Sequence, residues 1–216
     1  MEQAILTDVQ KRAITCIVQE PNLESFYLSG GTALAAFHLH HRLSDDLDFF
    51  CFQDPDKIFL HGFSEKLKTI LEASHVRYER LYDRNQFFYT LENEELKIEF
   101  TKYPFLQLAE PKVHDGIKID SFQDLAANKL MAMLDRFDPK DFVDLYFIFQ
   151  QKKLEEVRRD TETKFGVKID AIFLGGELAK VQRINALPKM LLPLTIEILK
   201  SYFSKVAQTL APEVLG

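Results

Sequence analysis

Residues 26–52 read FYLSGGTALAAFHLHHRLSDDLDFFCF, and this stretch of the 216-residue chain decides the fold class. Its apolar start predicts a buried strand over residues 26–29, which breaks at a pair of glycines. Residues 32–39 suit a short helix, and residues 46–52 suit a second strand. A strand, a glycine turn, a helix and a second strand in this order predict a mixed α/β fold.

Two carboxylates, Asp46 and Asp48, lie two residues apart in the second predicted strand. Alternate residues of a strand share one face of the sheet, so both carboxylates point the same way. Leu47, Phe49 and Cys51 point to the other side, into the core. Neighbouring carboxylates repel each other unless a cation lies between them, and hard divalent ions take oxygen ligands. The pair therefore predicts a site for Mg²⁺ or Mn²⁺.

The glycine pair upstream, Gly30 and Gly31, predicts a tight turn with exposed amides that opens a helix. Such a turn suits an anion such as a phosphate, and Thr32 adds a hydroxyl. A phosphate-binding turn followed by a metal-binding acidic pair is the layout expected for nucleotide chemistry. The alternative is a sharp chain reversal followed by an acidic edge strand that resists aggregation.

A hairpin is predicted by residues 86–91 and 96–101, which flank a polar turn. Its second strand alternates, so that Ile98 and Phe100 face the core and Glu99 leaves the core side. Lys97 shares the face of Glu99, and we expect it to be solvated. An exposed strand glutamate is common, so parity alone assigns no role to Glu99.

The chain is mainly helical from Ser121 onward. Ser121 followed by Asp124 predicts a capped helix start. Asp138 followed by Pro139 predicts a second helix start, because proline is favoured in the first helical position.

These segments, in this order, resemble the AbiEii/AbiGii-type nucleotidyltransferases of the DNA-polymerase-β-like superfamily. The resemblance covers roughly residues 24–150 and rests on Gly-Gly-Thr at 30–32, His-Arg-x-Ser at 41–44, Asp-x-Asp-Phe-Phe at 46–50, Lys129, and Lys-Asp-x-x-Asp-Leu at 140–145. Gly-Gly-Thr replaces the Gly-Ser that is common across the wider superfamily, and the threonine retains a hydroxyl for a phosphate contact.

The resemblance implies an α/β (α+β) fold built on a polymerase-β-like nucleotidyltransferase core, with helices flanking a small mixed sheet. We expect this core over residues 1–118. We expect a mainly helical C-terminal part over residues 119–216, which completes the nucleotide site.

The resemblance also implies roles for the first motifs. The turn at residues 30–32 would grip the triphosphate of an NTP, and Asp46 and Asp48 would hold two divalent ions. Superfamily members need a third carboxylate on a neighbouring strand, and Glu99 has the parity for it.

Lys129 lies beside an apolar helical stripe, so its ammonium must reach solvent, pair with an acid or meet a ligand. The family pattern places a lysine here that contacts the nucleotide phosphates. Asp141 and Asp144 are three residues apart and share one face of the next helix. The resemblance implies that one of these two aspartates positions the nucleotide or orients the lysine, and it leaves open which one.

Composition bounds the class of protein. The hydrophobic fraction is 46%, and no apolar run approaches the length of a membrane span. The start of the chain has no signal-peptide pattern, so we expect a soluble, cytoplasmic protein without a membrane partner. The net charge of −6 is unusual for a dedicated nucleic-acid binder. Zinc is disfavoured, because His38, His40 and His41 spread around a helix end and no cysteine cluster joins them.

The sequence thus predicts a metal-dependent nucleotidyltransferase that transfers a nucleoside monophosphate from an NTP to an acceptor hydroxyl. The resemblance implies a toxin of a toxin–antitoxin or abortive-infection system, with a tRNA acceptor end as substrate and a cognate antitoxin as partner. Two alternatives stay open: nucleotidylation of a protein or of a small molecule such as an aminoglycoside, and a catalytically silent nucleotide-binding module.

Overall fold

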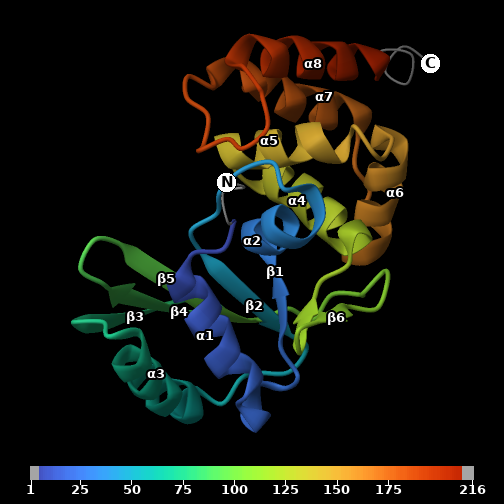
Figure 1. The fold of residues 1–216 in the computed structure, drawn as a ribbon. Coiled ribbons are helices and arrows are strands. Elements are labelled where there is room, and N and C mark those ends of the chain that lie inside the picture. The colour runs from blue at the N-terminus through green and yellow to red at the C-terminus, as the bar shows by residue number, and fades with distance from the viewer. Residues whose placement is uncertain (1–4, 211–216) are drawn as a thin grey trace. The chain divides into compact units, whose positions relative to one another are not determined.

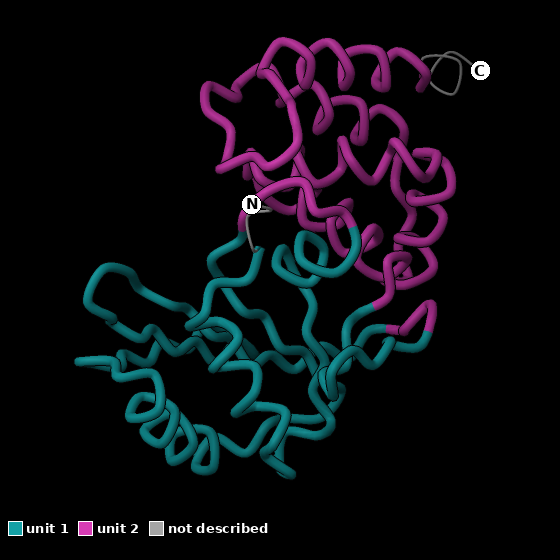
Figure 2. The backbone as a smooth tube through the Cα atoms, in the orientation of Figure 1, with its two compact units in different colours: residues 1–38, 44–105, 110–120 teal, residues 39–43, 106–109, 121–216 magenta. Residues whose placement is uncertain are grey.

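The structure is a computed structural model that describes residues 5–210. The described chain divides into two compact units (Figure 2). The first unit comprises the described residues of 1–38 together with 44–105 and 110–120, and the second comprises 39–43, 106–109 and the described residues of 121–216. A mixed sheet lies in the first unit and the second unit is mainly helical, so the mixed α/β fold is confirmed.

Seven strands form the sheet of the first unit (Figure 1). They are β1 (Tyr27–Ser29), β2 (Leu47–Cys51), β3 (His75–Leu81), β4 (Arg84–Thr90), β5 (Glu95–Lys102), β6 (Lys112–His114) and β7 (Ile117–Ile119). Their order across the sheet is β3-β4-β5-β2-β1-β7-β6. The pairs β2–β5 and β1–β7 are parallel and the other four are antiparallel, so the sheet is mixed.

The helices of the first unit are α1 (Asp8–Val18), α2 (Gly30–Leu34) and α3 (Lys57–Leu71), with a 3₁₀ turn at Pro21–Leu23. Helix α2 runs into a π-helical segment, Ala35–Leu39, and such segments are frequent at functional sites. A capping box at Thr7 and Gln10 closes the start of α1.

The core of the first unit lies on one face of the sheet. Leu47, Phe49 and Cys51 alternate with more exposed residues along β2, as the sequence predicts. Phe100 of β5 stacks on Phe49, and their ring centroids are 5.6 Å apart. The apolar sides of α1 and α3, including Leu67, are buried as well. Apolar burial is the main favourable contribution to folding, so this face fixes which residues of β2 and β5 face the opposite way.

The second unit contains α4 (Phe122–Asp135), α5 (Pro139–Ile148), α6 (Leu154–Phe165), α7 (Ala171–Ala179), a 3₁₀ turn at Lys180–Arg183, and α8 (Ile196–Thr209). Ser121 accepts a hydrogen bond from the amide of Asp124 at the start of α4, and Asp138 caps α5 ahead of Pro139. Both predicted helix starts are confirmed. The segment 39–43 joins this unit through a β-bridge between Arg42 and Met190.

Three strands are absent from the sequence prediction: β3, β6 and β7. All seven residues of β3 are at least partly exposed, so this strand carries no buried apolar face, and β6 and β7 have three residues each, too few for a periodic pattern to identify a strand. The spacing of apolar residues over 3–20 predicts an amphipathic helix there, and in the structure α1 is shorter and spans Asp8–Val18, while residues 3 and 4 lie outside the described part. Among the helices of the described residues, none combines the length and apolar character needed to cross a membrane.

Candidate functional site

Strand pairing brings the predicted carboxylates of the first unit together. Antiparallel pairing of β1 with β2 sets Ser29 opposite Asp48, so the glycine turn begins beside this carboxylate. Parallel pairing of β2 with β5 sets Asp48 opposite Glu99, and opposite residues share one face of the sheet. Asp46 comes just before β2 and has the same parity as Asp48. We call Asp46, Asp48 and Glu99 the acidic cluster.

Gly30 lies directly against this cluster. Its φ is +68°, a left-handed conformation that side chains other than glycine rarely adopt. A Cβ atom at this position would lie 2.2 Å from Oδ2 of Asp48, so only a residue without a side chain fits there. The Asp48 carboxylate therefore touches the backbone of the turn that the sequence assigns to phosphate binding.

Thr32 contacts the backbone of one member of the acidic cluster. Its side chain is buried, and its hydroxyl donates a hydrogen bond to the backbone carbonyl of Asp46. The hydroxyl predicted to contact phosphate thus already holds the start of β2. Gly31 lies in the first turn of α2, where backbone N–H groups have no partner within the helix.

Lys97 of β5 places its ammonium among the three carboxylates. Its Nζ lies 2.9 Å from Oδ2 of Asp46, 3.8 Å from Oδ1 of Asp48 and 3.8 Å from Oε2 of Glu99. The side chain is only 17% exposed, so the expectation that it is solvated is wrong. Neighbouring acids keep the pKa of Lys97 above its usual value although burial acts in the opposite direction, and the ammonium stays charged.

Glu99 is the most deeply buried member of the cluster, with a side chain 2% exposed. Arg84 donates two hydrogen bonds to it, from Nε at 2.6 Å and from Nη2 at 2.7 Å. Gln86 and Thr101 donate one hydrogen bond each, at 2.8 and 2.6 Å. Burial alone would raise the pKa of Glu99, but Arg84 and the other donors lower it, so the carboxylate is ionised and held in place.

The pKa of Asp48 is shifted in the direction opposite to that of Glu99. Burial, followed by repulsion from Glu99, raises the pKa of Asp48 to about 6, and Lys97 offsets only part of this rise. The site therefore concentrates more negative charge than its own cations compensate. An excess of negative charge in a partly buried cluster is typical of a functional site.

The acidic cluster fits a hard divalent cation by its chemistry. It offers carboxylate oxygens, the preferred ligands of Mg²⁺ and Mn²⁺, and all three carboxylates converge on one cationic group. As the side chains stand, no three His, Cys, Asp or Glu residues of the described chain are arranged to hold a metal ion. The Lys97 ammonium occupies the point of convergence instead.

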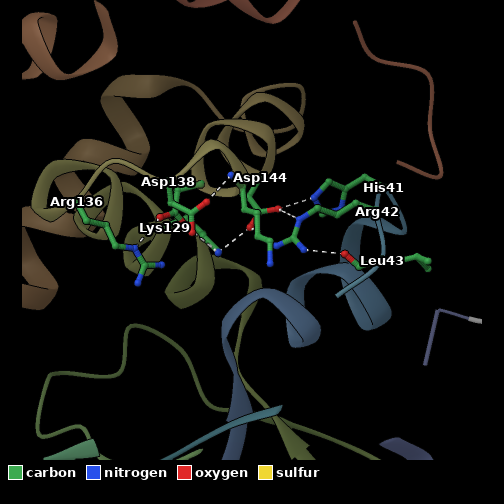
Figure 3. A network of polar contacts seen from close by, with 9 residues as sticks. His41, Arg42, Leu43, Lys129, Arg136, Asp138 and Asp144 are labelled. Carbon is green, nitrogen blue, oxygen red and sulfur yellow. Dashed lines mark hydrogen bonds and ion pairs between the residues drawn. The ribbon is translucent and has the colours of Figure 1, made fainter. Parts of the chain in front are cut away.

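The second unit holds a separate polar network around Asp144 (Figure 3). Arg42 donates to both carboxylate oxygens of Asp144, at 2.6 and 2.8 Å, and His41 lies 2.7 Å away through Nε2. Nζ of Lys129 lies 2.7 Å from Asp144 and 3.0 Å from Asp141. We call these five residues the buried network.

Charge pairing stabilises the ionised form of Asp144. Its burial would raise the pKa, but Lys129, Arg42 and His41 together hold it well below its usual value. Burial lowers the pKa of His41, which favours the neutral imidazole. The sequence leaves solvent, an acid or a ligand as partners of the Lys129 ammonium, and the structure shows two acids there. The contact with nucleotide phosphates that the family pattern implies stays a prediction.

The structure thus brings the predicted residues together in two groups, one in each unit. Asp46, Asp48 and Glu99 converge beside Gly30, and Lys129 meets Asp141 and Asp144. Three further partners were not predicted. Parity in the sequence places Lys97 on the face of Glu99 but does not reveal its partners, and Arg84 lies just before the predicted hairpin strand, so its place opposite Thr101 appears only in the structure. The partnership of Arg42 with Asp144 joins positions 102 residues apart, and no local pattern signals it.

Comparison with known proteins identifies the family of the chain. A family model described as "Nucleotidyl transferase AbiEii toxin, Type IV TA system" matches residues 12–211. An uncharacterised protein of Aquifex aeolicus is 33% identical over 159 residues, which cover 72% of this chain and 74% of the relative.

Two solved structures from Helicobacter pylori have a similar fold. One, described as a nucleotidyltransferase, superposes with a TM-score of 0.63 at 21% identity, covering 96% of this chain and 97% of its own. The other, JHP933, superposes with a TM-score of 0.60 at 22% identity, covering 94% of this chain and 90% of its own. At such identities the likeness establishes the fold, and the nucleotidyltransferase architecture is confirmed.

Proposed function

The chain belongs to the AbiEii family of nucleotidyltransferase toxins of type IV toxin–antitoxin systems, and from this we propose a metal-dependent transfer of a nucleoside monophosphate from an NTP to an acceptor hydroxyl. In this reaction a bond forms between the acceptor oxygen and the α-phosphorus, and the bond from that phosphorus to pyrophosphate breaks. The proton of the acceptor hydroxyl is released.

One observation carries the proposal. The three carboxylates of the acidic cluster converge on the Lys97 ammonium, and the carboxylate of Asp48 touches the backbone of the glycine turn. A phosphate bound at the turn would lie close to carboxylates that repel it, so phosphate binding there requires positive charge beyond that of Lys97, which a divalent cation would supply.

Each predicted site residue of the first unit has a distinct role in the proposed reaction. Asp46 and Asp48 would hold Mg²⁺ or Mn²⁺ with their carboxylates, and Glu99 would complete the set from a position fixed by Arg84. The bound ion supplies neutralisation of phosphate charge and a lower pKa for the acceptor hydroxyl. The backbone amides of the glycine turn bind phosphate oxygens.

We further propose, from the family motif, that Lys129 contributes to nucleotide binding in the second unit. The contacts within the unit support an orienting role for both aspartates, because Asp141 and Asp144 each lie within 3.0 Å of the Lys129 ammonium. Asp144 is the more strongly fixed of the two, since Arg42 also holds it.

The acceptor that we propose is a terminal hydroxyl of tRNA, as the resemblance to family toxins implies. A tRNA substrate places the reaction in the cytoplasm, and membership of a type IV system implies a cognate antitoxin. The net charge of −6 favours the competing acceptors, a protein or a small molecule, which do not require a basic surface.

The test is incubation of the protein with each α-³²P-labelled NTP, Mg²⁺ and total tRNA, compared with Asp48→Ala. We expect label in tRNA with one or more NTPs and a loss of at least about 100-fold in the variant, since electrostatic groups at a reacting phosphate are worth this much. Asp54→Ala is the matched control, because Asp54 is 62% exposed and pairs only with Lys102 among the described contacts.

Retained transfer in Asp48→Ala would falsify the metal-site assignment. Label in protein or in a small molecule instead of tRNA would keep the enzyme and replace the acceptor. Binding of NTP with no labelled product in lysate would favour the silent binding module. Asp46→Ala gives an independent repeat, because Asp46 carries the second carboxylate of the proposed pair.

A further inference from the structure

Lys97 stands where the proposed metal ion would stand. Its ammonium lies within 3.8 Å of a carboxylate oxygen of every member of the acidic cluster. Only the contact with Asp46, at 2.9 Å, has hydrogen-bond length, so the ammonium acts on the other two as a point charge. A compact, strongly charged group at the centre of three acids has the chemical character of a bound cation.

The balance of charges within the cluster also indicates that the Lys97 ammonium takes the place of a bound cation. Arg84 is committed to Glu99 through two hydrogen bonds. Among the described residues, Lys97 is the one cation that forms ion pairs with Asp46 and Asp48. The Lys97 side chain is 17% exposed and that of Asp46 is 43% exposed, so the lysine side chain is the more buried of the two.

We propose that Lys97 is a built-in counter-ion of the acidic cluster, and that a divalent ion binds by displacing its ammonium. This rests on one part of the proposed function, that Asp46 and Asp48 hold the divalent ion. The two cations exclude each other, because like charges at a few ångströms repel strongly in a partly buried site. Lys97 is thus a positioning residue that keeps the carboxylates together until the ion binds.

A neutral side chain at position 97 should therefore lower the stability of the metal-free protein and raise its affinity for the divalent ion. Without a divalent ion, Lys97→Met leaves Asp46 and Asp48 uncompensated, so the protein is less stable than wild type. With the ion, the competitor is gone, so the affinity for the ion rises. A purely structural salt bridge predicts the reverse for affinity, since loosening the cluster would weaken binding.

The experiment measures Mn²⁺ binding to the metal-free full-length chain by the loss of the free-ion signal in electron paramagnetic resonance. We expect Lys97→Met to bind Mn²⁺ at least about tenfold more tightly than wild type. Lys97→Gln serves as a second neutral variant. Lys102→Met is the matched control, because Lys102 ends the same strand and pairs with the exposed Asp54.

Thermal unfolding gives the second readout. In EDTA, Lys97→Met unfolds at a lower temperature than wild type, and Mn²⁺ raises its unfolding temperature by more than it raises that of wild type. Lys102→Met shows neither difference. If both neutral variants stay unfolded even with Mn²⁺, the ion does not replace the ammonium and the proposal is wrong.

The outcomes separate this proposal from the proposed function. Mn²⁺ binding by wild type with equal or weaker binding by Lys97→Met overturns the counter-ion role and leaves the metal site standing. Absence of Mn²⁺ binding in both proteins overturns the metal site itself, and the counter-ion role with it. Tighter Mn²⁺ binding by Lys97→Met than by wild type, abolished by adding Asp48→Asn in a double variant, supports both the metal site and the counter-ion role.

Discussion

Gly30 is required twice, by its backbone angle and by its neighbour. Its positive φ costs a residue with a side chain about 1–2 kcal/mol, and Oδ2 of Asp48 occupies the space of a Cβ. The absence of a side chain therefore lets the Asp48 carboxylate contact the turn. A single residue links the turn to the acidic cluster.

We predict that Gly30→Ala lowers the free energy of unfolding by more than about 1–2 kcal/mol and weakens Mn²⁺ binding, because Asp48 must move away from the new methyl group. Urea denaturation and Mn²⁺ titration measure the two effects. Gly62→Ala in α3 is the control, since nothing lies within 4 Å of its Cβ position. We expect this helical substitution to stabilise the protein by about 0.5–1 kcal/mol. Equal effects of the two substitutions would contradict the close approach.

Glu99 and Asp48 show how neighbouring carboxylates acquire different properties. Glu99 receives four hydrogen bonds, and its pKa is lowered by Arg84 and its other donors against the effect of burial. Asp48 receives no such hydrogen bond among the described contacts, and burial with repulsion from Glu99 raises its pKa. One carboxylate is thus permanently charged and fixed, and the other gains most from a cation.

Among the elements, α5 and the segment 39–43 together build the buried network. Asp141 and Asp144 come from the first turns of α5, which begins at the capped Pro139. His41 and Arg42 come from a segment that pairs with residues 189–191 through backbone hydrogen bonds. A helix start and an extended segment, each held by its own backbone bonds, can fix side-chain positions that neither would fix alone.

We expect unequal losses in the free energy of unfolding when different residues of the buried network are replaced. Asp144→Asn leaves Arg42 and Lys129 without their shared counter-ion, so we predict a loss of about 3–5 kcal/mol in the free energy of unfolding. Lys129→Met costs less, about 1–3 kcal/mol, because Arg42 still pairs with Asp144 and Arg136 still pairs with Asp141.

Urea denaturation of both variants checks this order. A larger loss in Lys129→Met than in Asp144→Asn would contradict the central place of Asp144. The milder variant also remains folded enough for transfer assays, so it separates a role of Lys129 in nucleotide binding from its role in stability.

At the scale of the whole molecule, the pH dependence of stability reflects opposing groups. Asp48 has a raised pKa, so its ionisation costs folding stability as pH rises from about 4, where the unfolded chain ionises, to about 6, where the folded protein does. His41 has a lowered pKa, so stability is lost as pH falls below about 6.5. These two trends oppose each other, and a variant is needed to separate them.

We predict that Asp48→Asn stabilises the metal-free protein, by an amount that grows between about pH 4 and 6 and is constant above. The plateau is roughly 1–3 kcal/mol, since one pKa unit corresponds to about 1.4 kcal/mol. Thermal unfolding of both proteins in EDTA at pH 4.5 and at pH 7.5 measures the difference, and His41 is common to both. A stabilisation that shrinks as pH rises would contradict the raised pKa of Asp48.

Local sequence determined the parts of this protein that depend on short-range periodicity. The two-residue period put Asp46, Asp48 and Glu99 on the face opposite Phe49 and Phe100, and the structure agrees. Glycine at position 30 predicted a turn, because few residues tolerate its backbone angle. Helix starts at Ser121 and Asp138 were predicted from another local feature, a side chain that accepts a hydrogen bond from a backbone amide in the first turn of the helix.

Only the tertiary structure decided which charges meet. Lys97 has a long flexible side chain, and its pattern in the sequence does not distinguish an ammonium in solvent from one among three carboxylates. Arg42 and Asp144 are brought together across 102 residues by the packing of helices and an extended segment. Periodicity reports the face on which a residue lies, whereas ion pairing depends on which elements pack there, and that depends on the burial of the whole apolar core.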